Sequence, residues 1–171
     1  FELGVDAGVP YVRFQNIGGE TFRVDLGSAV PASEWTHLAA VHNATAGTLT
    51  LYMNGTRGEV LDGLEEDDTP RSGVGDVRLA VSSNGGWTSA KIDQIRVWNV
   101  ARTQKVLDEN AARRIDAGTD GVVAAYRFDD GGLSVEDFAH AHPSPQAENY
   151  ALTAADYGVG DANPADGHAD W

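Results

Sequence analysis

Apolar and polar residues alternate along several short runs within residues 1–100. The alternating apolar positions are Phe22, Val24 and Leu26 in residues 21–27, Leu49, Leu51 and Met53 in 48–53, and Val77, Leu79 and Val81 in 77–81. A period of two places these side chains on one face of a strand and the intervening residues on the other. The pattern therefore predicts antiparallel strands with one face packed in a core.

Turn-forming residues separate these runs. Residues 43–47 (Asn-Ala-Thr-Ala-Gly) have the length of a short hairpin loop. The pair Asn54-Gly55 is a strong hairpin signal, because both residues tolerate positive φ. Residues 82–86 (Ser-Ser-Asn-Gly-Gly) form a third predicted turn. Many short strands at this spacing predict a β-sandwich or a barrel.

The period of the pattern changes after residue 98. Residues 95–98 still alternate as a strand does, with Ile and Val on one side and Arg and Trp on the other. From Thr103 to about Ile115 the pattern predicts a helix, with Thr103 as the N-cap and Gly118 as the stop signal. Residues 121–128 then predict one more strand.

Three segments together resemble the laminin-G-like and pentraxin-like group of concanavalin A-type jelly rolls, in the form found in bacterial and archaeal tandem repeats. Residues 34–55 resemble the central hairpin of that group, with Trp-Thr-His on one strand and Leu-Tyr-x-Asn-Gly on the next. Residues 77–103 resemble a later strand pair with Ile-Asp-x-x-Arg-x-Trp-Asn before a helix, and residues 124–132 resemble the Tyr-x-Phe-Asp-x-Gly segment that often follows. The resemblance implies an all-β fold, an antiparallel β-sandwich with one short helix after the penultimate strand.

The resemblance also implies a domain organisation. The sandwich would occupy residues 1–135, with Trp35 and Trp98 at structural positions. Residues 136–171 would form a loop-rich acidic tail, with one predicted strand within 149–158, that completes the sandwich or starts a following repeat. The group normally has several strands before the position of Phe1. We therefore expect the tail, a neighbouring domain or a partner subunit to cover the sheet edge that those strands would pair.

The composition and charge of the chain exclude several classes of partner and of chemistry. The formal net charge of −14 argues against nucleic acid or an anionic membrane surface, and no apolar run approaches the ~20 residues that membrane insertion needs. The absence of cysteine excludes disulfides, thiolate zinc sites and a cysteine nucleophile. With 17 Asp, 9 Glu, 10 Arg and 2 Lys, the chain resembles halophilic proteins, although an ordinary acidic soluble protein is the alternative.

The sequence gives no reason to predict an enzyme. Retaining glycoside hydrolysis needs two carboxylates about 5 Å apart, and no strand carries the alternating acidic residues that would supply them. The acidic run at residues 65–68 lies between Gly63 and Pro70, which predicts a solvated loop. There is also no Gly-x-Ser-x-Gly elbow and no phosphate-binding loop.

Calcium is a candidate cofactor, because two Asp-rich segments offer the oxygen ligands that it prefers. The candidate metal ligands are Asp129, Asp130 and Asp137 in the first segment and Asp161, Asn163, Asp166 and Asp170 in the second. The spacing of the second segment has one residue too many before Gly167 for a regular calcium loop. The alternative is that both segments are ordinary acidic loops.

A sugar site would need an aromatic face beside polar groups. Trp87 lies at a predicted turn next to Asn84 and could stack on a sugar ring, although packing across the sheet is the alternative. Gln94 and Arg96 share a strand face and form a second candidate ligand surface. Asn43 and Asn54 each begin an Asn-x-Thr glycosylation triplet on a predicted turn.

These observations predict a non-catalytic binding module, located outside the cell or on its surface. It would recognise a glycan or an extracellular protein at the loop rim of the sandwich, with calcium as a candidate aid. The alternative is a structural or adhesion module of a surface layer or filament, completed by a neighbouring chain or domain.

Overall fold

The computed structural model describes residues 1–71, 79, 90–116, 118–129, 134–135, 137–140, 152–153, 162–163 and 168–169. The chain forms two compact units, one from Phe1–Val74 with Ala101–Arg113 and the other from Gly75–Val100 with Arg114–Trp171. Each unit has a hydrophobic core of its own.

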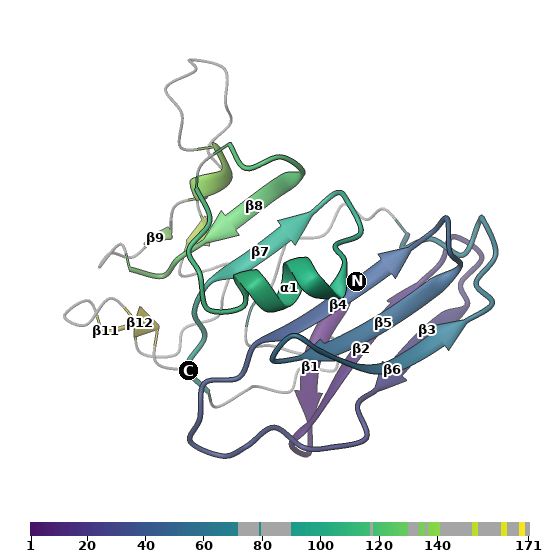
Figure 1. The fold of residues 1–171 in the computed structure, drawn as a ribbon, viewed down its shortest axis with the longest axis horizontal. Coiled ribbons are helices and arrows are strands. Elements are labelled where there is room, and N and C mark those ends of the chain that lie inside the picture. Colours follow the sequence, from purple (N-terminus) through teal and green to yellow (C-terminus); the bar gives the residue numbers. More distant parts are fainter. Residues whose placement is uncertain are drawn as a thin grey trace. The chain divides into compact units, whose positions relative to one another are not determined.

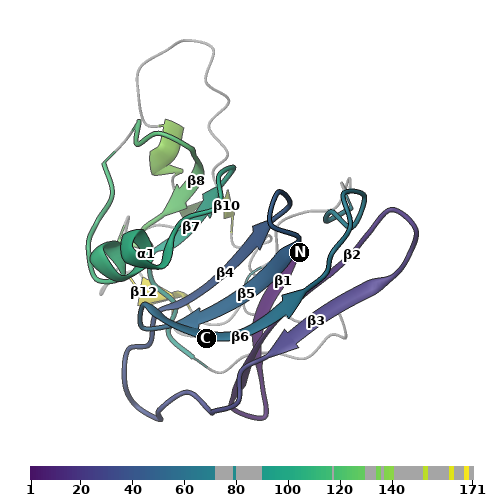
Figure 2. The same cartoon turned by 45° about the vertical axis from the view of Figure 1, so that its right-hand side comes forward.

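The first unit contains two three-stranded antiparallel sheets. One sheet consists of β1 (Glu2–Asp6), β2 (Val9–Gln15) and β3 (Thr21–Asp25), and the other of β4 (Leu38–Asn43), β5 (Thr48–Met53) and β6 (Thr56–Asp62). Neighbouring strands follow one another in the chain, so each sheet is made of successive hairpins (Figures 1 and 2). The strands predicted at residues 21–27 and 48–53 are confirmed.

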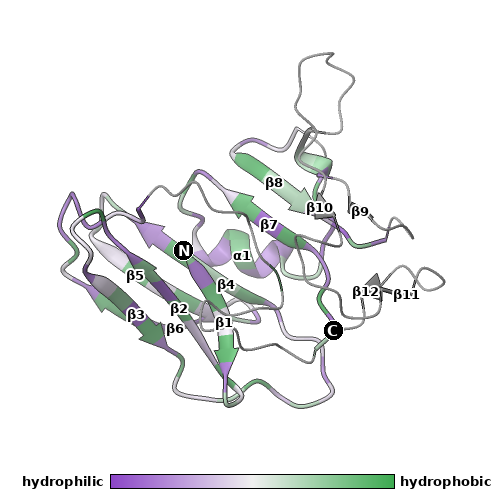
Figure 3. Ribbon diagram, turned by 180° about the vertical axis from the view of Figure 1, so that it is seen from behind, coloured by the Kyte–Doolittle hydropathy of each residue, from purple (hydrophilic) through white to green (hydrophobic). Residues whose placement is uncertain are grey.

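The core of the first unit lies between the two sheets. Its buried residues are Val12, Phe14, Val24 and Leu26 from the first sheet and its continuation, with Leu49, Leu51 and Leu64 from the second sheet and the segment after it. The Phe14 ring lies 5.2 Å from the ring of Phe22 and 5.3 Å from that of His42, so it contacts both sheets. Hydrophobic and hydrophilic residues follow one another along these strands (Figure 3), and the predicted sandwich with apolar inner faces is confirmed.

The outer face of the second sheet departs from the predicted pattern. Thr50 and Tyr52, which the alternation placed on a more polar face, are both buried. Helix α1 (Gln104–Asn110) packs against β6, and a Cβ atom on Gly55 would lie only 2.8 Å from the Cα atom of Asp108. Tertiary packing on this face therefore outweighs the simple in-and-out pattern.

Both predicted hairpin turns of this sheet are present. Residues 44–47 join β4 to β5, and Asn54 and Gly55 join β5 to β6 with φ values of 50° and 75°. The turn is fastened to the start of β4, because the backbone N–H of Asn54 donates to the carbonyl of His37 at 2.8 Å. The backbone N–H of His37 donates in return to Oδ1 of Asn54, also at 2.8 Å.

The predicted start of the helix is correct and its predicted end is wrong. Thr103 is the N-cap, with its side-chain oxygen accepting from the backbone N–H of Val106 at 3.4 Å. The helix ends at Asn110, whose side-chain amide donates to the carbonyl of Val106 at 2.7 Å, and it does not reach Ile115. Ile115 lies beyond the helix, is buried, and belongs to the second unit.

The second unit contains a pair of antiparallel strands, β7 (Ile95–Trp98) and β8 (Val122–Tyr126). Their core consists of Leu79, Tyr126 and Phe128, with Ile92, Ile95 and Ala124 packed against it. The strand predicted at residues 95–98 is confirmed, and the one predicted at 121–128 is present but shorter, since it ends at Tyr126 and Phe128 has φ of 56°. Apart from Leu79, the strand and turn predicted within residues 77–86 lie outside the described residues.

The shorter elements of the second unit come last in the chain. They are β9 (Ser134–Val135) paired with β10 (Leu152–Thr153), the 3-10 helix η1 (Phe138–His140), and β11 (Ala162–Asn163) paired with β12 (His168–Ala169). The domain boundary predicted at residue 135 stays a prediction. Among the described residues, no helix has the length and apolar character that a membrane crossing requires.

Candidate functional site

A polar pocket of about 410 Å³ lies at one end of the first unit. It is formed by the loop between β2 and β3, here called the 16–20 loop, and by the segment after β6, here called the 63–68 segment. The lining consists of Asn16, Ile17, Gly18, Glu20 and Phe22 from the first side and Gly63, Glu65, Asp67 and Asp68 from the second. Its volume is within the range of small-ligand sites.

The 16–20 loop is a tight turn held by its own backbone. The N–H of Asn16 donates to the carbonyl of Glu20 at 3.0 Å, and the N–H of Gly19 donates to the carbonyl of Asn16 at 3.1 Å. Gly19 has φ of 88°, a conformation that favours glycine. The Gln15 side chain donates to the Gly19 carbonyl at 2.9 Å, which fixes the loop to the end of β2.

Asn16 joins the two sides of the pocket. Its side chain is only 4% exposed, and its amide nitrogen donates to Glu20 Oε2 at 3.0 Å and to Asp68 Oδ1 at 2.8 Å. Its Oδ1 atom accepts from the backbone N–H of Glu20 at 2.9 Å. One buried amide therefore holds a carboxylate from each side of the pocket.

The 63–68 segment is held just as locally. Asp68 Oδ2 accepts from the backbone N–H of Glu65 at 3.0 Å, and the N–H of Asp68 donates to the carbonyl of Glu65 at 3.1 Å. The ring nitrogen Nε2 of His42 lies 3.2 Å from the Asp68 carbonyl, and the N–H of Leu64 donates to the Gly47 carbonyl at 3.0 Å. These contacts tie the segment to β4 and to the turn that follows it.

The pocket combines negative charge with two apolar side chains. Glu20, Glu65, Asp67 and Asp68 contribute four carboxylates, and among the residues that the structure describes no Lys, Arg or His lines the pocket. Ile17 is 83% exposed at the tip of its loop, which leaves an apolar surface beside the carboxylates. The arrangement can accept hydrogen bonds from a polar ligand and contact its apolar face.

The outer face of the first sheet carries a second polar cluster around Tyr11. Burial, followed by the hydrogen bond to the Glu2 carboxylate, raises the pKa of Tyr11 to about 12. Arg13 donates twice to Glu2 Oε2 at 2.9 Å, and the guanidinium of Arg23 lies 4.3 Å from the Tyr11 ring centre. Arg23 also donates to Asp25 at 2.8 Å. Because these groups pair with one another, we interpret the cluster as stabilising the sheet.

The sequence-predicted ligand residues lie away from the pocket or outside the described residues. Trp87 and Asn84 are among the residues that the structure does not describe. Gln94 and Arg96 lie in the second unit, where Arg96 donates to the Gln94 side chain and Gln94 has φ of 54°. Burial, and secondarily the charge of Arg127, lowers the pKa of Arg96. The assignment of these four residues to a ligand site stays a prediction.

The candidate calcium ligands that can be placed have protein partners. Asp129 pairs with Arg114 at 3.0 Å. Asp137 is 1% exposed, and its Oδ1 atom accepts from the backbone N–H groups of Ala125 at 2.8 Å and Ala139 at 2.9 Å. Asp130, Asp161, Asp166 and Asp170 lie outside the described residues, and Asn163 is described only as backbone in β11.

In the part of the chain that the structure describes, no group of three or more His, Asp and Glu side chains could hold a metal ion. Calcium in the Asp-rich segments stays a prediction, because most of those residues lie outside that part. The glycosylation candidates sit at the two predicted turns, where the Asn43 side chain accepts from the N–H of Ala46 at 3.0 Å. Asn54 is exposed at its turn.

Sequence reasoning missed the pocket and misjudged one tryptophan. The acidic residues 65–68 were correctly predicted to lie in a loop, but the pattern did not show that residues 16–20 lie opposite them. The signal that was available is the turn sequence Asn16-Ile-Gly-Gly-Glu20, which sets an apolar side chain at an exposed tip. Trp35, which the resemblance placed at a structural position, is 65% exposed.

The two three-stranded antiparallel sheets and their shared core form a β-sandwich. The chain belongs to the concanavalin A-like lectin/glucanases superfamily, because residues 1–107 match the Laminin_G_3 model of that superfamily. The predicted family resemblance and fold class are therefore confirmed. A search of curated proteins found no match to the chain.

Two solved structures are similar to the chain. A protein of Bacteroides ovatus, provisionally described as carbohydrate binding, is 22% identical with a TM-score of 0.58 over 77% of this chain. This chain spans only 38% of that protein. An S-layer domain-containing protein of Clostridium thermocellum is 18% identical with a TM-score of 0.37, over 66% of this chain and 62% of that one. At these identities the first likeness shows the fold alone.

Proposed function

We propose that the chain is a non-catalytic carbohydrate-recognition module whose binding site is the pocket between the 16–20 loop and the 63–68 segment. The pocket itself is the observation that carries the proposal. It offers clustered hydrogen-bond acceptors beside the exposed Ile17 side chain, and a sugar has hydroxyl donors on its edges and apolar C–H groups on its faces. The superfamily and the description of the Bacteroides ovatus protein support a sugar as the ligand.

The carboxylates of the pocket are better suited to binding than to hydrolysis. Glycoside hydrolysis uses a carboxylic acid kept protonated in an enclosed, apolar setting, opposite a second carboxylate. Glu65 and Asp67 are exposed, while Glu20 and Asp68 are both held by the Asn16 amide. No pair in the pocket therefore has the enclosed setting that the reaction uses. Recognition of a glycan also suits a location outside the cell or on its surface, which is part of the proposal.

A glycan panel with site variants tests this function. The purified chain is screened against neutral, acidic and amino-bearing oligosaccharides, once with calcium and once with a chelator. The double change Ile17→Ala with Asp67→Asn should weaken binding at least tenfold, because both side chains line the pocket and are exposed. Trp35→Ala and Arg96→Ala serve as matched controls at the other candidate surfaces.

Each result has a definite meaning. Loss of binding only in Trp35→Ala or Arg96→Ala would place the site elsewhere on the chain. A folded chain that binds no glycan in either condition would overturn the proposal and favour a structural module. Binding that disappears with the chelator would support the prediction of calcium assistance.

A further inference from the structure

The hydrogen-bonding groups that the pocket presents to a ligand are almost all acceptors. The amide nitrogen of Asn16 has two hydrogens, and these go to Glu20 at 3.0 Å and to Asp68 at 2.8 Å. The remaining polar side chains of the lining are the four carboxylates, which have no hydrogen to donate when ionised. The side chains of the pocket therefore favour a ligand that brings hydrogen-bond donors.

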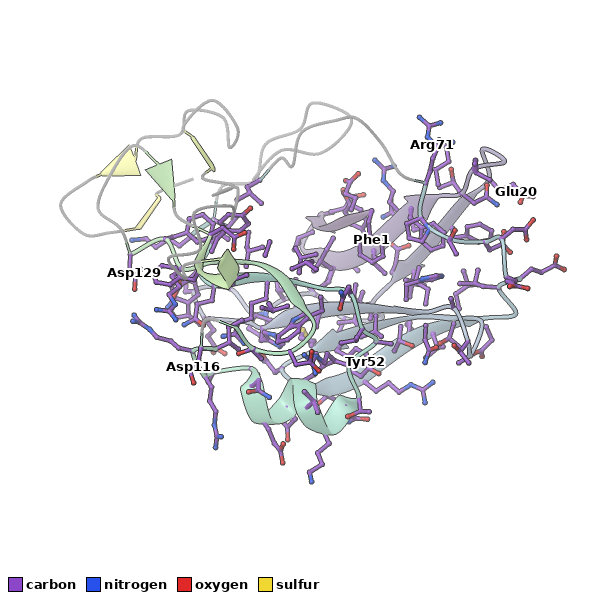
Figure 4. All side chains as sticks on the ribbon, turned by 90° about the horizontal axis from the view of Figure 1, so that it is seen from above. Phe1, Glu20, Tyr52, Arg71, Asp116 and Asp129 are labelled. Atoms are coloured by element: carbon purple, nitrogen blue, oxygen red, sulfur yellow. The ribbon has the colours of Figure 1, made fainter. Side chains whose placement is uncertain are left out.

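The negative charge of the pocket also favours ligands that carry hydrogen-bond donors over anionic ligands. Arg71 lies close to the end of β2, because its backbone N–H donates to the Gln15 carbonyl at 2.8 Å. Figure 4 shows Arg71 and Glu20 at the same end of the first unit, but Arg71 is not part of the pocket lining. An anionic ligand would meet four like charges and no cation among the described lining residues, whereas an ammonium group would be attracted by each carboxylate.

We infer that the pocket selects sugars by their charge, binding amino-bearing saccharides more tightly than neutral ones and rejecting uronates and sulfated saccharides. This inference rests on the proposed function and adds the class of glycan. Glu65 and Asp67 are the groups that would meet the ammonium, because both are exposed and neither is held by the Asn16 amide. An ammonium has three donors and no acceptor, which matches the carboxylate side chains of the lining.

Three oligosaccharides of one length test the order. Chitosan hexasaccharide carries free amines, chitin hexasaccharide carries the same backbone with neutral acetamides, and a galacturonate hexasaccharide is anionic. Titration calorimetry at about pH 5.5, above the ordinary pKa values of Asp and Glu, should give affinities in that order. Raising the salt from about 0.05 M to 0.5 M should reduce the advantage of chitosan and leave chitin binding nearly unchanged.

The whole chain is acidic, so attraction to a polycation must be separated from binding in the pocket. The pair Glu65→Gln with Asp67→Asn removes two charges inside the pocket, and the pair Glu34→Gln with Glu59→Gln removes two exposed charges outside the lining. The first pair should lower chitosan affinity about two- to fivefold for each charge, as for exposed ion pairs, and the second pair should leave it within twofold. Arg71→Gln should not weaken chitosan binding.

The outcomes separate the inference from the function on which it rests. If chitin binds in the pocket and chitosan binds no tighter, the proposed function stands and the charge selection is wrong. If both variant pairs weaken chitosan equally, the attraction belongs to the whole surface and the inference is wrong. If none of the three saccharides binds while the panel finds another glycan for the pocket, the charge selection is wrong and the proposed function stands; a folded chain that also binds nothing on the panel overturns both.

Discussion

Replacing Asn16 with Asp tests whether one buried amide holds the two sides of the pocket together. The change is nearly isosteric, but it removes both N–H donors and sets a third carboxylate among two others. Those two lie 3.0 Å (Glu20) and 2.8 Å (Asp68) from the present amide nitrogen. The matched control is Asn16→Ala, which removes the same donors without adding charge.

The cost can be estimated from the contacts. A hydrogen bond to a charged partner contributes about 1.5–3 kcal/mol, so two lost bonds would give about 3–6 kcal/mol. Because Glu20 is exposed and Asp68 is half-buried, solvent screens part of this, and we expect Asn16→Asp to lose about 2–4 kcal/mol at pH 7. Asn16→Ala adds no repulsion but also removes the Oδ1 acceptor of the Glu20 N–H, so the part of the difference between the variants that changes with pH reports the added charge.

The two variants should also differ in their pH dependence. Like charges raise the pKa of the introduced carboxyl group in the folded state above its unfolded value of about 3.9. Below about pH 4 the introduced carboxyl group is protonated and does not repel Glu20 and Asp68. The repulsion grows as the pH rises from the unfolded to the folded pKa of this group, and it is complete above the folded pKa. The stability of Asn16→Asp relative to Asn16→Ala should therefore rise at acid pH.

Urea denaturation followed by far-UV circular dichroism measures both effects. Wild type and both variants are compared at pH 7 and at about pH 4, so that the general acid sensitivity of the chain cancels in the difference between variants. If Asn16→Asp stays within about 0.5 kcal/mol of wild type, or if its gap to Asn16→Ala is the same at both pH values, Asn16 does not hold the pocket as described.

Three further predictions follow from the packing. Gly58→Ala should lose about 1–3 kcal/mol in urea denaturation, because a Cβ atom there would lie 2.1 Å from Leu26 Cδ1; additivity with Leu26→Ala would contradict this, since the double variant should lose less than the sum. The stability that Tyr11 contributes should be complete below about pH 10 and be lost as pH rises through its folded pKa of about 12, and Tyr11→Phe should remove one late step from the tyrosinate absorbance titration. Asp137→Ala should lose about 2–4 kcal/mol and Asp137→Asn less, because the alanine leaves the buried N–H of Ala125 without its acceptor; equal thermal shifts for the two variants would refute that role.

Local pattern predicted most of the first unit because its strands obey local rules. Leu49 and Leu51 alternate with polar residues and are buried in the core, and Asn54-Gly55 forms the turn that its tolerance of positive φ indicates. The helix end could not be predicted in this way. The sequence pattern favours a helix as far as Ile115, whereas the helix ends at Asn110, and no local signal in the sequence marks that position.

The pocket was beyond sequence reasoning for a different physical reason. Asn16 and Asp68 are separated by 52 positions, and nothing in either local sequence indicates that their side chains meet. The acidic run was correctly interpreted as a loop, yet its significance depends on the amide that faces it. For Trp35 the error is of the opposite kind. The family resemblance predicted a structural position, but the side chain is exposed in the fold.

The exposed Trp35 and the pocket are separate candidates, because they lie at opposite ends of β4. Trp35 precedes the strand, whereas the turn after the strand is joined to the pocket side by the hydrogen bond from Leu64 to Gly47. A six-residue strand at about 3.4 Å per residue sets them roughly 20 Å apart, so one sugar ring cannot contact both. Single exposed aromatic residues are common on protein surfaces, while a buried amide that aligns carboxylates from two loops needs a more specific cause. Loss of glycan binding through Ile17 and Asp67 but not through Trp35 would therefore identify the binding end of the sandwich.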